Sequence, residues 1–152
     1  MQSLLAAVGR SKAGPERSLF EHYAGRLRGG LTVREVEEKR PLPVAERMTR
    51  EGELLLGCVP AGARVVALDE RGKALDSRTF ADRLGRWRDE AVPCVAFLIG
   101  GADGHSDAVR QRADLLLSFG VMTWPHMLVR GLLAEQLYRA QCILDGHPYH
   151  RD

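Results

Sequence analysis

Residues Val121–Asp152 read VMTWPHMLVRGLLAEQLYRAQCILDGHPYHRD, a sequence that predicts a long helix followed by a polar tail. Pro125 stands where a helix can begin without losing a hydrogen bond, and Gly146 follows the last apolar pair as a C-terminal stop. A surface helix confines its apolar residues to one stripe, but here they occupy well over half of the circumference. We therefore expect the helix to be covered twice, by its own sheet and by a second partner. The apolar residues are Met127, Leu128, Val129, Leu132, Leu133, Leu137, Ala140, Ile143 and Leu144.

The five residues after Gly146, HPYHR, are dense in side chains that bind, stack or move protons. Chain ends are commonly frayed, but this one places a tyrosine, a histidine and a fixed cation in succession. Cys142, His147 and His150 raise the alternative of a zinc site. Structural zinc needs four ligands, usually as two close pairs, and only one close pair is present. We therefore predict no metal.

The composition indicates one ordinary domain, 1–152, able to bury a sizeable core, because 45% of its 152 residues are hydrophobic. A net charge of +2, from 22 basic and 20 acidic residues, excludes a general attraction for polyanions, so any RNA contact must use a local patch. The three cysteines form no C-x-x-C pair, which favours buried thiols in a reducing compartment. No apolar run approaches the roughly 20 residues that span a bilayer, and residues 4–8 are too short for a signal peptide. We expect a cytoplasmic protein.

Strand and helix signals alternate along the chain. Strands are predicted over 4–8, 31–36, 64–68, 93–99 and 115–117, with a turn over 69–72. Helices are predicted over 16–27, from the prolines at 41 and 43 to residue 57, from a Ser77 cap through Trp87, and from a Ser106 or Asp107 cap through Ala113. Fully apolar strands in this order predict an α/β domain with a parallel sheet covered by helices on both faces.

In such sheets, ligands bind beyond the carboxyl ends of the strands, which selects three loops: after Leu68, after Ile99 and around 120–125. Residues 100–104, GGADG, would let main-chain N–H groups approach a ligand closely, although a tight turn explains such a pattern more often. The glycine order differs from a Rossmann fingerprint, and no Gly-Lys-Ser/Thr of a P-loop follows. The hydrolase patterns G-x-S-x-G and H-E-x-x-H do not occur.

Several blocks together carry a specific resemblance. They are 98–104 (LIGGADG), 122–126 (MTWPH), Arg130, 133–140 (LAEQLYRA) and 148–151 (PYHR), with shorter matches at 7–9, 68–69, 72–73 and from Ser77 to 81. Over its full length the chain resembles the RlmH family of the SPOUT (alpha/beta knot) superfamily, the bacterial methyltransferases that modify N3 of a pseudouridine in 23S ribosomal RNA.

This resemblance implies a C-terminal trefoil knot, a homodimer that would explain the apolar surface of the final helix, and S-adenosylmethionine as cofactor. It implies no separate RNA-binding domain, and recognition of 23S rRNA within the assembled ribosome. Trp124 departs from the smaller aliphatic residue usual in the family, and Arg10 replaces the usual lysine. The implied RNA contacts are Arg10, His126 and Arg130. The implied cofactor-binding residues are Leu68, Gly100, Gly101, Gly120, Val121, Met122, Thr123, Trp124 and Pro125.

The same resemblance implies that the tail acts on the substrate. The imide nitrogen must lose its proton before it attacks the methyl group, and His150 or Tyr149 could act as base or relay. Arg139 or Arg151 could stabilise negative charge on the flanking carbonyl oxygens, and Tyr149 could instead stack on the base. Arg139 also has a simpler interpretation, an intrahelical ion pair with Glu135.

Two other functions remain open at this point. The chain could methylate a different RNA position, such as a ribose hydroxyl or a tRNA base, because the cofactor segments do not distinguish these targets. It could also be a cofactor-free ribosome-binding module on the same scaffold. The terminal Pro-Tyr-His-Arg favours the pseudouridine enzyme over the first alternative, and the intact Gly-Gly-x-x-Gly and Thr-Trp-Pro segments argue against the second.

Overall fold

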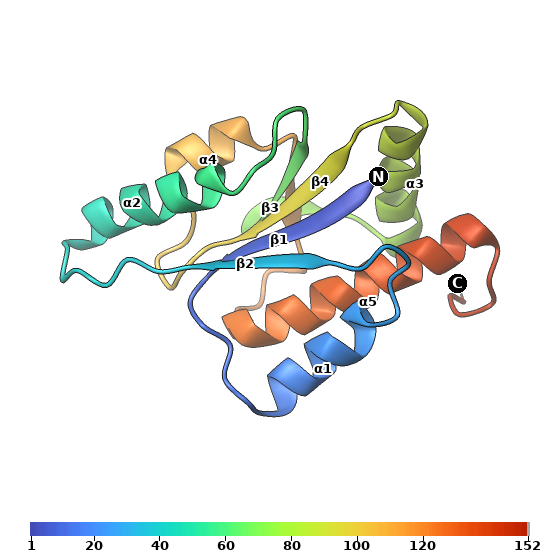
Figure 1. Cartoon of the computed structure of the whole chain (residues 1–152), viewed down its shortest axis with the longest axis horizontal. Coiled ribbons are helices and arrows are strands. Elements are labelled where there is room, and N and C mark those ends of the chain that lie inside the picture. Colours follow the sequence, from blue (N-terminus) through green and yellow to red (C-terminus); the bar gives the residue numbers. More distant parts are fainter. Residues whose placement is uncertain (152) are drawn as a thin grey trace.

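A computed structural model describes residues 1–151 and contains a five-stranded sheet in which every paired strand is parallel (Figure 1). The strand order is β2-β1-β4-β3-β5. The strands are β1 (Gln2–Val8), β2 (Thr32–Val36), β3 (Arg64–Ala74), β4 (Cys94–Ile99) and β5 (Leu115–Ser118). The helices are α1 (Pro15–Ala24), α2 (Val44–Gly57), α3 (Ser77–Asp89), α4 (Asp107–Arg112) and α5 (His126–Asp145). The predicted α/β class is confirmed.

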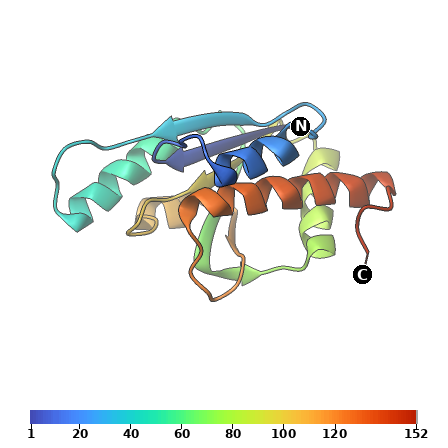
Figure 2. The same cartoon turned by 90° about the horizontal axis from the view of Figure 1, so that it is seen from below.

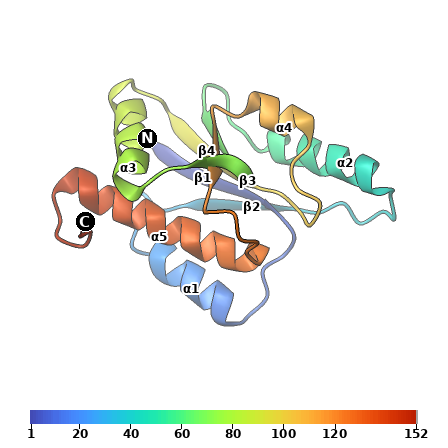
Figure 3. The ribbon, with the colours of Figure 1, turned by 180° about the vertical axis from the view of Figure 1, so that it is seen from behind.

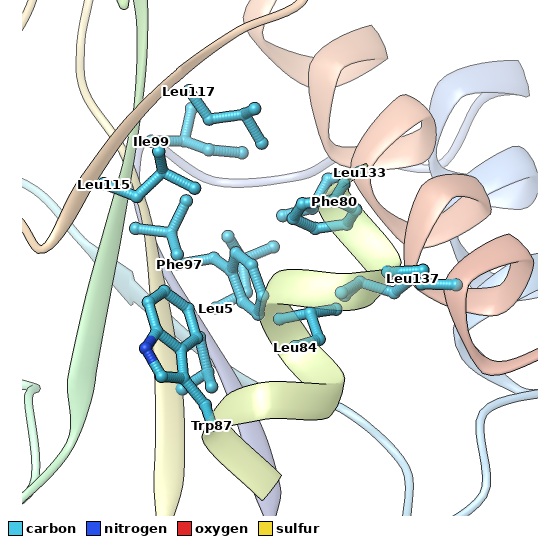
Figure 4. Packing of buried hydrophobic residues seen from close by; sticks show 14 of the residues in the cluster. Leu5, Phe80, Leu84, Trp87, Phe97, Ile99, Leu115, Leu117, Leu133 and Leu137 are labelled. Carbon is cyan, nitrogen blue, oxygen red and sulfur yellow. The ribbon is translucent and has the colours of Figure 1, made fainter. Parts of the chain in front are cut away.

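Helices cover both faces of the sheet, because successive side chains of each strand point to opposite sides. Figure 1 shows α2 and α4 on one side and α1, α3 and α5 on the other. The larger core lies on the second side, where Leu5 and Phe97 of the sheet pack with Phe80 of α3 and Leu133 of α5 (Figure 4). Leu133 is fully buried, which stabilises the fold by about 1.5–3 kcal/mol for such a side chain.

The sequence predicted that the third strand ends at Leu68, but β3 continues beyond this residue. Leu117 of β5 pairs first with Leu68 and again with Lys73, so residues 69–72 form a bulge and the strand continues to Ala74. Gly72 allows the two strands to approach this closely because it has no side chain. A Cβ at this position would lie 2.5 Å from the Leu116 carbonyl oxygen, which is too close for a real contact. Figures 2 and 3 show the segment from β5 to α5 running beside the end of β3, where the C-terminal knot is expected.

Helix α5 has no fully exposed residue between 127 and 144. The sheet covers one side, while Leu19 of α1 approaches Gly131, and Leu144 packs against Gly85 of α3. The expected double cover is therefore present, but much of the second layer comes from this chain itself. Leu128 and Leu132 lie outside both core clusters and are only partly buried.

Helix ends differ in detail from the sequence expectations. Asp76, not Ser77, caps α3, because its carboxylate accepts the Thr79 N–H at 2.7 Å, which leaves the Ser77 hydroxyl for another partner. Ser106 caps α4, α1 ends at Ala24 instead of residue 27, and Gly146 ends α5 with φ +72 as expected. The three cysteines are free thiols. No helix within residues 1–151 is long and apolar enough to cross a membrane.

Candidate active site

A cavity of about 660 Å³ lies beyond the carboxyl ends of β4 and β5 and beside the bulge of β3. We call it the strand-end cavity; its lining comes mainly from residues 68–71, 99–105 and 117–129, with Met48 of α2. The three loops selected from sequence therefore meet at one place. Of the predicted cofactor residues, Val121 and Pro125 do not line the cavity, and Val121 is 92% exposed. Those that do are Leu68, Gly100, Gly101, Gly120, Met122, Thr123 and Trp124.

Two buried polar side chains fill the space behind the glycine loop 100–104. A Cβ on Gly101 would lie 2.9 Å from both carboxylate oxygens of Glu51, and a Cβ on Gly100 would lie 3.1 Å from Nδ1 of His105. The absent side chains thus leave room for Glu51 and His105 below the loop. At Gly100 and Gly101 the loop therefore presents main chain to the strand-end cavity.

Glu51 and His105 each keep one buried atom without a hydrogen-bond partner, Oε1 and Nδ1. Burial, together with the charge of Asp103, raises the pKa of the Glu51 carboxyl. Burial lowers the pKa of His105, which holds the ring neutral, and its Nε2 lies 3.2 Å from the Leu98 carbonyl oxygen. Because that oxygen can only accept, the His105 proton is on Nε2 and Nδ1 carries the lone pair.

Asp69 supplies a fixed charge at the wall of the strand-end cavity. Burial alone would raise the pKa of Asp69, but the Arg71 N–H and the Arg110 guanidinium outweigh it and lower the pKa. Arg110 Nη1 lies 2.5 Å from the Asp69 carboxylate. This ion pair ties the bulge of β3 to α4, so the loop is held in place before any ligand arrives.

The residues expected to contact RNA are in different environments. Arg10 is exposed and forms an ion pair with Glu37, and His126 is exposed and lines the strand-end cavity. Arg130 is only 4% exposed; its guanidinium binds Glu35 at 2.5 Å and the Gly9 carbonyl oxygen at 3.1 Å. Arg130 thus connects α5 to β1 and β2 inside the fold, and this geometry supports a positioning role instead of an RNA contact.

A second cavity, of about 740 Å³, adjoins the first. We call it the tail cavity, because His150 lines it together with residues 74–78, Phe80 and the α5 residues Leu132, Glu135 and Gln136. The Ser77 hydroxyl donates to the Gln136 carbonyl oxygen at 2.8 Å. The two cavities share Leu117, Phe119, Gly120 and Trp124 as a common wall.

Glu135 is the acceptor around which the tail is organised. Its Oε1 accepts the Tyr149 hydroxyl at 2.9 Å and Nε of Arg139 at 3.0 Å. Arg139 also donates to Nδ1 of His150 at 3.0 Å and lies 4.8 Å from the Tyr149 ring centre. The structure thus brings together Arg139, Tyr149 and His150, whereas Arg151 is exposed beyond them.

The protonation states of this cluster follow from its contacts. Burial and the hydroxyl's bonds to Tyr23 and Glu135 raise the pKa of Tyr149. Tyr149 is therefore a phenol at neutral pH, not a phenolate base. The Glu135 contact raises the pKa of Arg139 further, so this residue is a permanent cation. Arginine can only donate, so Nδ1 of His150 is the acceptor and a neutral His150 carries its proton on Nε2.

Several of these contacts could not be predicted from sequence patterns. Glu51 resembled an ordinary helix residue, and His105 carried no signal above background. One signal was available: Gly52 lies inside a helix, where glycine is costly, and a Cβ there would lie 2.2 Å from the Ser106 hydroxyl oxygen. Within residues 1–151, no group of three His, Cys, Asp or Glu side chains is arranged to hold a metal ion.

Comparison with known proteins assigns this architecture to a family. The family model described as "Predicted SPOUT methyltransferase" matches residues 1–150. Proteins named "Ribosomal RNA large subunit methyltransferase H" are 66% identical in Rhodospirillum rubrum, 64% in Paramagnetospirillum magneticum and 61% in Rhodospirillum centenum, each over 99% of both chains. The solved SpoU methyltransferase AviRb from Streptomyces viridochromogenes, in complex with AdoMet, is 15% identical with a TM-score of 0.47, covering 91% of this chain and 57% of its own.

Proposed function

This chain belongs to the SPOUT methyltransferase family, and on that premise we propose that it methylates N3 of a pseudouridine in 23S ribosomal RNA, with S-adenosylmethionine as donor. We further propose that it acts as a homodimer, in the cytoplasm, on the assembled ribosome. The observation that carries the proposal is the pair of adjoining cavities, one lined by strand-end loops and one by the tail. A transferase needs to hold two ligands side by side, and this arrangement provides for both.

The strand-end cavity fits the cofactor in size and in chemistry. Its volume of about 660 Å³ lies within the range of small-molecule pockets. Leu68, Ile99, Leu117 and Val129 offer apolar contact for an adenine ring, and the glycine loop offers main-chain groups for polar atoms. The bound donor would supply an electrophilic methyl group on a sulfonium.

The tail residues would then act on the acceptor ring. An imide nitrogen that loses its proton leaves negative charge on the two flanking carbonyl oxygens, and preorganised donors stabilise that charge. Arg139 is a permanent cation, and Nε2–H of His150 is a donor held by the Arg139–Nδ1 bond. Tyr149 donates to Glu135 and so fixes the tail against α5. We assign charge stabilisation to Arg139 and His150, positioning to Tyr149, and proton loss to solvent.

The homodimer is supported by apolar surface that this chain leaves uncovered. Val121 and Met122 are 92% and 72% exposed in the loop before α5, and the partly buried Leu128 and Leu132 of α5 belong to neither core cluster. Exposed apolar groups of this kind mark interaction sites. Leu133 cannot serve in such an interface, because it is fully buried in the core of its own chain.

The test is methyl transfer from labelled S-adenosylmethionine to 70S ribosomes, isolated large subunits and free 23S rRNA, followed by mapping of the modified nucleoside. We expect label in a single 3-methylpseudouridine and the highest rate with ribosomes. Label in a ribose, in another base or in tRNA would replace the proposed target with another. Cofactor binding without any transfer would favour a non-catalytic role.

A further inference from the structure

We propose that Glu51 is the counter-charge for the positively charged methyl donor, so that the strand-end cavity favours the donor over the neutral product. S-adenosylmethionine carries a sulfonium cation, and S-adenosylhomocysteine has an uncharged thioether at the same place. The inference rests on the proposed donor and is independent of the RNA position that is methylated. Glu51 is a buried ionisable group that has no part in the chemistry assigned to the tail residues.

The Glu51 carboxyl lies directly behind the wall of the strand-end cavity. Gly101 belongs to the lining, and a Cβ on this residue would lie 2.9 Å from both Glu51 oxygens. Because a C–C bond is about 1.5 Å long, both oxygens lie within about 4.5 Å of the Gly101 Cα. At this point the wall between the carboxyl and the cavity is therefore the main chain of one glycine.

The packing of α2 holds Glu51 in this position. Gly52 follows it, and a Cβ on Gly52 would lie 2.2 Å from the Ser106 hydroxyl oxygen, so α2 and the start of α4 are in close contact. Glycine is unfavourable inside a helix, so this close approach has a cost in stability. Glu51 is 7% exposed as a result, and its carboxyl is kept beneath the glycine loop.

The Glu51 carboxyl lacks the cation that a neighbouring buried carboxylate has. Asp69 lines the same cavity and is bound by the Arg110 guanidinium. Oε1 of Glu51 is buried and has no hydrogen-bond partner among residues 1–151. Burial raises the pKa of Glu51 in the free protein. A buried carboxylate without a cation is costly, so a cation that binds nearby would favour the ionised form.

The charged groups around Glu51 do not supply that cation. Asp103 of the glycine loop and Glu38, from the segment before α2, are carboxylates and oppose its ionisation. Arg47 of α2 favours ionisation, but its guanidinium also lies 4.0 Å from the Asp103 carboxylate, so its charge is shared. Burial lowers the pKa of His105, which keeps this ring beneath the same loop neutral. The missing positive charge can arrive with a ligand in the cavity.

Binding of the sulfonium and ionisation of Glu51 then assist each other. The sulfonium lowers the pKa of Glu51, so binding of the donor releases a proton to solvent, and donor affinity rises with pH between the bound and the free pKa values. Methyl transfer leaves the bonding electron pair on sulfur, which becomes a neutral thioether. Glu51 then takes a proton back from solvent, the attraction is lost and the product leaves more readily.

Calorimetry with S-adenosylmethionine and S-adenosylhomocysteine tests the charge directly. The two ligands have the same amino and carboxyl groups, so the difference between their affinities isolates the sulfonium. Glu51→Gln keeps the shape without the charge. It should weaken the donor by roughly tenfold at pH 8, as for unit charges several ångströms apart, and the product by less than about threefold. Glu51→Asp should keep much of the preference for the donor. Glu53→Gln, which removes a charge from the exposed face of α2, should change neither affinity.

A proton count gives a readout that a purely structural role would not change. Titrations in phosphate and in Tris, which differ in ionisation enthalpy, measure the protons exchanged on binding. In the wild type the donor should release more protons than the product, and the ratio of the two affinities should rise from about pH 5 to about pH 8. Both effects should disappear in Glu51→Gln. Because this variant should be at least as stable as the wild type, a damaged fold would not explain their loss.

The outcomes separate this inference from the proposed function. If the wild type binds neither ligand, the proposed donor falls and the inference falls with it. If both ligands bind but Glu51→Gln keeps the wild-type ratio of affinities and the wild-type proton release, Glu51 is not the counter-charge, and the proposed function stands. If Glu51→Gln weakens donor and product equally, Glu51 supports the glycine loop without sensing the sulfonium, and the inference is overturned.

Discussion

The strand-end cavity and the tail cavity, which share Trp124, are lined by different kinds of chemical groups. The strand-end cavity presents mainly loop backbone and apolar side chains, and its glycine loop is supported from below by Glu51 and His105. The tail cavity presents polar side chains from α3, α5 and the C-terminal tail, joined by hydrogen bonds between distant residues. From this difference we propose that the first cavity provides affinity for the cofactor and that the second acts on the acceptor. Substitutions should therefore separate the two properties.

Removing polar groups from the cluster of Arg139, Tyr149 and His150 should have the largest effect, and only on methyl transfer. Arg139→Ala and His150→Ala should each lower transfer to ribosomes, the stronger of them by roughly 10²–10⁴-fold, because a positioned donor or proton-transfer group contributes about that much. Their melting temperatures and cofactor affinities should stay near wild type. Arg151→Ala is the matched control, since Arg151 lies exposed beyond the cluster, and its effect should be smaller. Wild-type rates of methyl transfer in all three variants would show that these residues take no part in the reaction.

A side chain on the glycine loop should act on cofactor affinity. In Gly101→Val the Cβ would meet the carboxylate of Glu51 at 2.9 Å, so the loop must move away from Glu51. We expect calorimetry to show at least about tenfold weaker S-adenosylmethionine binding in a protein that stays folded. Gly57→Ala is the control, because it adds a Cβ where no atom lies within 4 Å. A Gly101→Val protein with unchanged affinity would show that the loop does not hold the cofactor.

The proposed dimer should depend on the part of α5 that lies outside the two core clusters. Leu128→Glu places a carboxylate on a partly buried position outside both core clusters, so the chain should fold but dissociate at micromolar concentration. Light scattering gives the mass directly. Leu133→Asp is the contrasting variant. It places a charge in the core of the chain itself, so the protein should unfold. A wild-type protein that is already monomeric would refute the dimer.

The smallest effect concerns Glu51 and pH. Its folded pKa lies above its unfolded value, so its contribution to stability is full below the unfolded pKa near 4.5 and declines as pH rises through the folded pKa. Glutamine cannot ionise, so Glu51→Gln should melt a few degrees above the wild type at pH 8 and together with it at pH 4.5. Thermal scans at the two pH values measure this. A variant less stable at pH 8 would mean that the charged carboxylate is stabilising.

The sequence predicted the strand-end cavity better than the tail cavity for a physical reason. A glycine run after an apolar strand, and the rule that ligands bind at strand ends, are local signals, and they found Gly100, Gly101 and Gly120. The Tyr149–Glu135 bond, the Ser77–Gln136 bond and the burial of Arg130 join residues far apart, which periodicity cannot reveal. The same holds for β3, because its extension beyond Leu68 exists only through renewed pairing with β5.

The most direct test of the division between the cavities is the S-adenosylmethionine affinity of Arg139→Ala, measured by calorimetry beside its rate of methyl transfer to ribosomes. Arg139 belongs to the tail cluster and does not line the strand-end cavity. The affinity should therefore stay within about threefold of the wild type while transfer falls by roughly 10²-fold or more. A parallel loss of affinity and transfer would contradict the separation, since the tail would then be holding the cofactor.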